Sequence, residues 1–198
     1  MDLKDKKIGF AITGSFCTLS KTVKALEALK NTGAIITPIL STNVATLDTR
    51  FYKSSDFIKD VTDITGIAPI TSIANAEPIG PKKMFDLLIV APCTGNTLSK
   101  LAYGITDTPV TMAVKAHLRN ARPLLIAVST NDGLAGSAKN IGHLLNYKNV
   151  YFVPFNQDDA IKKPTSLVAD FDKIVESASL ALDKQQVQPV IQPTRATS

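Results

Sequence analysis

Small polar side chains gather at four points in the sequence, each at the end of an apolar run. These segments are Gly14-Ser15-Phe16, Ser41-Thr42-Asn43, Thr94-Gly95-Asn96-Thr97 and Ser129-Thr130-Asn131-Asp132. Glycine lets backbone N–H groups approach a ligand, hydroxyl and amide groups add further donors, and a helix that follows such a turn favours negative charge at its start. The chemistry that these residue types suit is the binding of an anion such as phosphate.

Each turn also has a purely structural interpretation. Gly14 fits an ordinary strand-to-helix turn as well as an anion site, and the G-x-G-x-x-G dinucleotide pattern is absent because the turn holds one glycine. Ser41 and its two neighbours suit helix caps, and the composition from Ser129 to Gly133 is sufficient for a turn. An N-cap at Thr94 explains one threonine but not Gly95, Asn96 and Thr97 together. We therefore expect a ligand at the third turn.

Histidine and cysteine offer little further chemistry. His117 and His143 are predicted to be packed or surface groups, because neither stands beside a partner for acid–base work. Cys17 and Cys93 are far apart and have no adjacent histidine or pair of cations, so neither a disulfide, a metal site nor a reactive thiolate is expected. The charged run from Asp158 to Lys163 fits a solvated loop, with attraction of a dicarboxylate as the alternative.

The elements that must position these turns alternate between strands and helices. Apolar runs predict strands over residues 7–12, 34–40, 85–90, 124–128 and 150–153, with Pro92 halting the third. Strands that are apolar on both faces and separated by helices predict a parallel sheet with helices on both sides. We expect an α/β fold: a single Rossmann-like or flavodoxin-like three-layer domain over residues 1–184, closed by a helix that starts near Ser166. The Gln/Pro-rich residues 185–198 are predicted to be a tail, or an arm that docks on a partner. In such sheets ligands bind at the carboxyl ends of the strands, where the four turns lie.

The composition excludes several classes of protein. The chain has 198 residues, of which 44% are hydrophobic and 20% charged, so it can bury a sizeable core. Its net charge of +5 is scattered, which argues against a nucleic-acid partner. The longest apolar run, Leu87 to Pro92, is far too short for a membrane span, and no signal peptide is recognised. We expect a cytoplasmic protein with no membrane partner.

Three segments carry a resemblance to a known family. Gly14-Ser15-Phe16, the run from Pro92 to Lys100, and Gly104-Ile105-Thr106-Asp107 resemble the flavoprotein family of flavin-containing cysteine decarboxylases. That family has Pro-Ala-Ser-Ala-Asn-Thr and Gly-Ile-Ala-Asp at the latter two places. The resemblance implies FMN as the cofactor, and it implies cofactor-binding residues around the phosphate and near the ring: Gly14, Ser15, Phe16 and Ser41 for the phosphate, and Thr94, Gly95, Asn96 and Thr97 for the ring.

The same resemblance argues against decarboxylation. The decarboxylases use a Pro-x-Met-Asn substrate clamp, of which this chain keeps only Asn131, and a histidine after the second strand, which residues 41–60 lack. Within the family the sequence is most similar to an oxidoreductase component active in sporulation. This similarity implies a homo-oligomer, a partner A subunit that uses NAD(P), and a small dicarboxylate substrate of the dihydropyridine type, with Asn131 as its contact. The alternatives are a non-catalytic flavin-binding scaffold and a flavin-dependent cysteine decarboxylase or flavin prenyltransferase-like enzyme.

Overall fold

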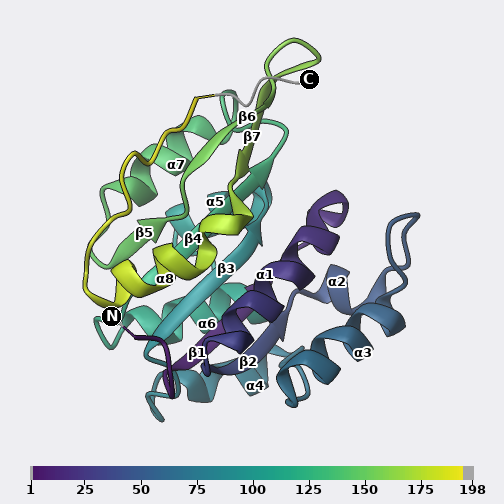
Figure 1. Ribbon diagram of the computed structural model, residues 1–198, viewed down its shortest axis with the longest axis vertical. Helices are drawn as coiled ribbons and strands as arrows, with labels where there is room; N and C mark the ends of the chain where they lie inside the picture. Colours follow the sequence, from purple (N-terminus) through teal and green to yellow (C-terminus); the bar gives the residue numbers. More distant parts are fainter. Residues whose placement is uncertain (1, 194–198) are drawn as a thin grey trace.

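A twisted sheet with helices on both faces forms the centre of the molecule (Figure 1). The structure is a computed structural model, and it describes residues 2–193. Its strands follow the order β2-β1-β3-β4-β7-β6, and β5 pairs with the first half of β4. The strands are β1 (Lys7–Ile12), β2 (Ile35–Leu40), β3 (Leu87–Cys93), β4 (Leu124–Thr130), β5 (Val150–Phe152), β6 (Phe155–Asp159) and β7 (Lys163–Ala169).

The predicted parallel sheet is confirmed for the first five strands, which are joined by helices. The chain is an α/β domain with a mostly parallel sheet. β3 is buried at all seven positions, as expected for a strand covered on both faces. Pro92, however, does not halt this strand, because β3 continues through it to Cys93 with an irregular register after Val90. Pro92 has no backbone N–H to donate to the neighbouring strand, and the irregular register at this point accommodates it.

An antiparallel strand replaces the start of the predicted closing helix. Ser166 lies in β7, which pairs with β6 and with the end of β4, and the closing helix α8 begins only at Ile174. The run from Asp158 to Lys163 is a hairpin rather than an isolated loop, closed by an ion pair between the Lys163 Nζ and Asp158 Oδ2 atoms at 2.6 Å. In Figure 1 this hairpin projects beyond the helices. The sheet is therefore mixed at this side.

Helices α1 and α8 cover one face of the sheet, while α5 and α6 cover the other (Figure 1). α6 begins with a capping box, in which the Thr108 hydroxyl accepts from Thr111 N. No helix within residues 2–193 is both long enough and apolar enough to cross a membrane. The helices are α1 (Leu19–Asn31), α2 (Thr42–Thr46), α3 (Ser54–Thr65), α4 (Ile73–Ala76), α5 (Gly95–Ala102), α6 (Pro109–Leu118), α7 (Ala138–Leu145) and α8 (Ile174–Leu182), with short 3-10 helices η1 (Phe16–Thr18), η2 (Glu77–Ile79) and η3 (Phe171–Lys173).

The outer strands β2, β5 and β6 each form hydrogen bonds with a segment that is not itself a strand. Leu40 N of β2 donates to the carbonyl of Ile70 at 2.9 Å, and Phe155 N of β6 donates to the carbonyl of Val190 at 2.9 Å. The side-chain amide of Gln186 contacts both backbone groups of Phe152 in β5, at 2.7 and 2.8 Å. The described part of the Gln/Pro-rich segment, 185–193, thus packs on its own sheet. Residues 194–198 of the predicted tail lie outside the described residues.

Candidate functional site

The carboxyl ends of β1 and β3 are tied together by Thr13. Its hydroxyl donates to the Pro92 carbonyl at 2.7 Å and accepts from the Thr94 N–H at 3.1 Å. This side chain is almost completely buried, at 2% exposed, so its hydrogen bonds are made away from water. The first and third predicted turns therefore lie side by side, as the parallel topology requires.

The first and fourth turns also meet, across the end of β3. The Ser15 and Ser129 hydroxyl oxygens lie 2.8 Å apart, although 114 positions separate them in the sequence. The Ser15 side chain does not cap η1, so its hydroxyl is available for this contact. Ser129 in turn stands at the buried end of β4, two residues before the predicted substrate contact Asn131.

A first hollow, which we call the Ser41 groove, lies between the ends of β1, β2 and β3. It has a volume of about 330 Å³. Its lining consists of hydroxyl and amide side chains, one glycine and one cation, with no carboxylate among the lining residues: Thr13, Gly14, Ser41, Thr42, Asn43, Thr94, Asn96, Thr97, Lys100 and Thr108. Such a lining suits a ligand with negative charge. The structure thus brings five residues of the predicted cofactor site to one hollow, namely Gly14, Ser41, Thr94, Asn96 and Thr97.

A second hollow, the Asn131 cleft, lies on the other side of Gly14 and Thr94, which line both. Its volume is about 620 Å³. The lining comes from η1, α1, the α2–α3 loop, the end of β4 and the β6–β7 hairpin: Gly14, Ser15, Phe16, Cys17, Thr18, Lys21, Arg50, Phe51, Thr94, Ser129, Thr130, Asn131, Asp158, Lys163, Ser166, Leu167 and Val168. Ser15 and Phe16 of the predicted phosphate site, and Asn131, belong to this cleft.

Gly14 lines both hollows and carries no side chain that would project into either. A Cβ atom at this position would stand 3.3 Å from the Phe16 ring and 3.8 Å from the Asn43 Cβ atom. A side chain here would therefore crowd Phe16, which lines the Asn131 cleft, and Asn43, which lines the Ser41 groove.

Helix α5 begins against the polar cluster that follows β4. Gly95 at its first turn is so close to this cluster that a Cβ atom would lie 2.6 Å from Ser137 Oγ and 2.7 Å from Asp132 Oδ1 and Thr130 Oγ1. Thr130 and Ser137 both donate hydroxyl hydrogen bonds to Asp132, and these bonds lower the pKa of its carboxyl group. Gly95 is thus required by close packing, which the sequence pattern alone does not reveal.

The capping roles that the sequence allowed are present in the structure. The Thr94 hydroxyl caps α5 by accepting from Thr97 N at 3.3 Å, and the Ser41 hydroxyl caps α2 by accepting from Val44 N at 3.4 Å. A hydroxyl that accepts one such bond still has its own hydrogen to donate. Capping and ligand binding are therefore compatible at both positions.

The one cation of the Ser41 groove is held by an acid just outside it. Lys100 Nζ donates to both carboxylate oxygens of Asp107, at 2.7 and 2.8 Å, and this contact lowers the pKa of Asp107. The pair joins the last residues of two segments, Pro92 to Lys100 and Gly104 to Asp107, that carry the resemblance to flavoproteins. Sequence spacing gave no sign of it, because seven positions and the end of α5 separate the two residues.

The histidines and the buried cysteine do not supply an acid or base to either hollow. His117 is 1% exposed, its Nε2 atom lies 2.9 Å from the Pro123 carbonyl, and burial lowers its pKa to about 4. His143 lies on α7 beside the Tyr103 ring. Cys93 is buried, which raises the pKa of its thiol, whereas Cys17 is exposed in the Asn131 cleft. The prediction that both histidines are packed or surface groups agrees with these positions.

The comparisons with known proteins agree with this architecture. The Flavoprotein family model matches residues 1–179. The chain is 45% identical, over 189 residues, to the B subunit of dipicolinate synthase from Bacillus subtilis, and the match covers 96% of this chain and 94% of that protein. It superimposes on the crystal structure of the corresponding B subunit from Bacillus halodurans with a TM-score of 0.90, at 42% identity, covering 98% and 99% of the two chains.

More distant relatives share the fold. The structure of the FMN-dependent cysteine decarboxylase SpaF gives a TM-score of 0.68 at 20% identity, covering 91% of this chain and 99% of that one. Both the sequence matches and the arrangement of the strand ends point to one group of proteins. The chain belongs to the Flavoprotein family, and within it the chain is a homologue of the dipicolinate synthase B subunit.

Proposed function

We propose that this chain is the FMN-binding B subunit of a dipicolinate synthase that oxidises dihydrodipicolinate to dipicolinate during sporulation, together with an A subunit that uses NAD(P). The observation that carries the proposal is the meeting of two polar hollows at Gly14 and Thr94, in a chain that resembles the B subunit over nearly its whole length. One hollow suits a cofactor phosphate and the other suits a small acid.

The proposed phosphate site of FMN is at Gly14, where the Ser41 groove meets the Asn131 cleft. The Ser41 hydroxyl lines the groove beside this point, and Ser15 and Phe16 of the first turn line the cleft beside it. Lys100, which is paired with Asp107, also lines the groove. Thr94, Gly95, Asn96 and Thr97 lie near the flavin ring. The fit rests on a lining of neutral donors without a carboxylate and on the space that Gly14 leaves open. Bound FMN would accept two electrons as a hydride equivalent.

Asn131 is the proposed substrate contact in the Asn131 cleft. Its side-chain amide has an N–H₂ group that donates to a carboxylate and an oxygen that accepts from a ring N–H. Thr165 and Ser166 hold the residue, because the Thr165 hydroxyl donates to the Asn131 carbonyl at 2.7 Å and the Ser166 hydroxyl lies 3.5 Å from its side-chain oxygen. Oxidation of the dihydropyridine removes two electrons and two protons: a hydride would pass to the flavin or to the nicotinamide and the remaining proton to water, and aromatisation of the ring drives the reaction.

A homo-oligomer is part of the proposal, and apolar exposure beyond α5 supports it. Tyr103 is 60% exposed and Ile105 is 47% exposed, next to the segment that carries Asn96 and Thr97. Burying such side chains against a second copy removes apolar surface from water. Light scattering should report a species larger than one 21.2 kDa chain over a range of protein concentrations. A single species of that mass throughout would contradict this part.

A scaffold without catalytic groups of its own is the second candidate function. It is favoured by the positions of His117 and His143, because neither lines either hollow. On this hypothesis the chain binds flavin, or holds the A subunit, and the partner performs all proton transfers. The scaffold predicts that this chain accelerates the A subunit to the same rate whether or not it carries FMN. Such equal acceleration, relative to the A subunit alone, would favour the scaffold.

The proposed function is tested by mixing the two purified proteins with dihydrodipicolinate and NAD(P). Dipicolinate is followed by its ultraviolet absorbance, and each protein alone serves as the control. We expect this chain to be nearly inactive alone and to accelerate the A subunit. Equal rates for the A subunit with and without this chain would reject the proposal. Asn131→Ala should slow the mixture about 5- to 150-fold, the effect of losing one polar substrate contact.

A further inference from the structure

The Asn131 cleft contains more positive charge than its own residues neutralise. Its lining includes the cations Lys21, Arg50 and Lys163 and the acid Asp158. Lys163 and Asp158 form an ion pair at 2.6 Å. Neither Lys21 nor Arg50 forms an ion pair with any residue of the described range. Two cations without an ion-pair partner among the described residues therefore face one cleft, and they match a ligand that carries two negative charges.

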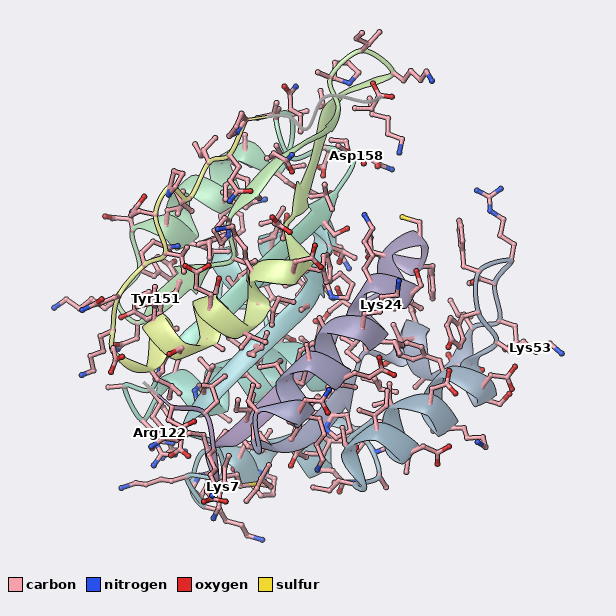
Figure 2. The ribbon with its side chains drawn as sticks, in the orientation of Figure 1. Lys7, Lys24, Lys53, Arg122, Tyr151 and Asp158 are labelled. Atoms are coloured by element: carbon pink, nitrogen blue, oxygen red, sulfur yellow. The ribbon has the colours of Figure 1, made fainter. Side chains whose placement is uncertain are left out.

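The two cations come from different elements. Lys21 is in the first turn of α1, where it also borders the neighbouring hollow lined by Lys24 and Asp170. Arg50 is in the loop between α2 and α3. Figure 2 shows that this loop, next to the labelled Lys53, and the hairpin that carries Asp158 stand on either side of the N-terminal end of α1. The two cations thus reach the cleft from separate elements, α1 and the α2–α3 loop.

An aromatic ring stands beside one of these cations. The Arg50 guanidinium carbon lies 4.7 Å from the centre of the Phe51 ring, an arrangement that holds the guanidinium group by a cation–π contact. Phe51 is 49% exposed and lines the cleft, so part of its ring is free to contact a ligand. An aromatic face packs well against a planar ring. Arg50 and Phe51 together thus suit a planar ligand with carboxylates at its rim.

We infer that Arg50, Lys21 and Phe51 form the recognition site for the substrate of the proposed reaction: Arg50 and Lys21 each bind one carboxylate, and Phe51 packs against the ring. The inference rests on the proposed function for the identity of the ligand, a dihydropyridine dicarboxylate, whose oxidised product pyridine-2,6-dicarboxylate serves as the stable probe. Asn131 lines the same cleft, which shares Gly14 and Thr94 with the hollow proposed for FMN. The α2–α3 loop thereby supplies two of the three residues that recognise the substrate.

The test is calorimetric titration of the full chain with pyridine-2,6-dicarboxylate, alone and with the A subunit. Arg50→Gln and Lys21→Gln should each weaken binding about tenfold, as the loss of one charge-assisted contact predicts. Lys53→Gln and Lys24→Gln are the matched controls, because each removes the same charge from the same loop or helix but neither residue lines the cleft. Both controls should bind like the unchanged protein.

Two further ligands separate the roles of charge and ring. Pyridine-2-carboxylate lacks one carboxylate, so it should lose affinity in only one of the two cation variants. Phe51→Ala should weaken pyridine-2,6-dicarboxylate about fivefold more than its saturated analogue piperidine-2,6-dicarboxylate, because only the planar ring can stack. Equal losses for both rings would overturn the role of Phe51.

The inference and the proposed function fail in different ways. Losses in Arg50→Gln and Lys21→Gln no larger than in the two controls would overturn the inference, as would the absence of saturable binding to the unchanged chain with and without the A subunit. Both outcomes are compatible with FMN binding by this chain and with a faster reaction when the two proteins are mixed, so the proposed function would stand. Conversely, Arg50-dependent binding in a chain that does not accelerate the A subunit would support the recognition site and reject the proposed function.

Discussion

The hydroxyl groups of Ser15 and Ser129 lie within hydrogen-bond distance, at 2.8 Å, and so join the end of β1 to the end of β4 across β3. This contact places the first turn at the boundary between the Ser41 groove and the Asn131 cleft. A charge introduced at Ser15 would therefore stand close to any phosphate held by Gly14 and Ser41.

Ser15→Asp should weaken FMN binding by at least about tenfold, because a carboxylate beside a phosphate introduces repulsion between like charges in a partly buried place. Titration of the apo-protein followed by flavin fluorescence measures the effect. Ser15→Ala is the control: it removes the contact with Ser129 without adding charge, so its loss should be smaller. Equal affinities for the Asp variant and the unchanged protein would place the phosphate elsewhere.

Gly95→Ala should lower the free energy of unfolding by about 1–3 kcal/mol, because the added methyl group would overlap the Asp132 cluster. Gly142→Ala in α7 is the matched control. A Cβ atom there meets nothing within 4 Å, so alanine should instead raise the stability by about 0.5–1 kcal/mol. Urea unfolding of both variants measures these changes. An unchanged free energy of unfolding in Gly95→Ala would show that the start of α5 can move to make room for the methyl group.

His117 should make the protein less stable as the pH falls from about 6.5 to about 4. Burial lowers its pKa to about 4 in the folded state from an ordinary value of 6.5, so in this range the unfolded chain binds a proton that the native chain does not. The loss should reach at most about 3 kcal/mol. His117→Gln removes this titration. The free energies of unfolding of the two proteins should therefore converge, or cross, towards pH 4, and parallel pH profiles would contradict the assignment.

The chain should release no carbon dioxide from peptidyl or pantothenoyl cysteine. Thr130 stands where the decarboxylases have the methionine of their clamp, and residues 41–60 contain no histidine to serve the reaction. The described residues that line the Asn131 cleft include no histidine from other segments either. Measured turnover of either substrate, reduced by Asn131→Ala, would contradict this prediction.

The convergence of the four turns was predictable because buried parallel strands have a distinct sequence pattern. Ile8 to Ile12 and Leu124 to Val128 are apolar without alternation, and the ends of neighbouring parallel strands must meet. The sequence does not reveal the β6–β7 hairpin, because every residue of β6 after Phe155 is polar. The register of this strand depends on its pairing with β7 rather than on an apolar face.

The parts of the site that depend on tertiary contacts were not visible in the sequence. Gly95 is explained only by its distance to Asp132, and the pairing of Lys100 with Asp107 depends on how the chain leaves α5. Arg50 and Phe51 belong to an irregular loop without periodicity, so no pattern indicated that they line the cleft. An arginine followed by an aromatic residue is too common a pair to identify a site by itself.

The segments that form hydrogen bonds with the outer strands β2, β5 and β6 influence how copies of this chain can assemble. An open strand offers its backbone groups to a second molecule, and sheets can grow from one copy into the next in that way. Here Ile70, Gln186 and Val190 already occupy backbone groups of the three outermost strands. Pairing of these strands with a second copy at the covered positions would require the segments to detach first. The covered edges therefore favour association through the side chains of helices and loops.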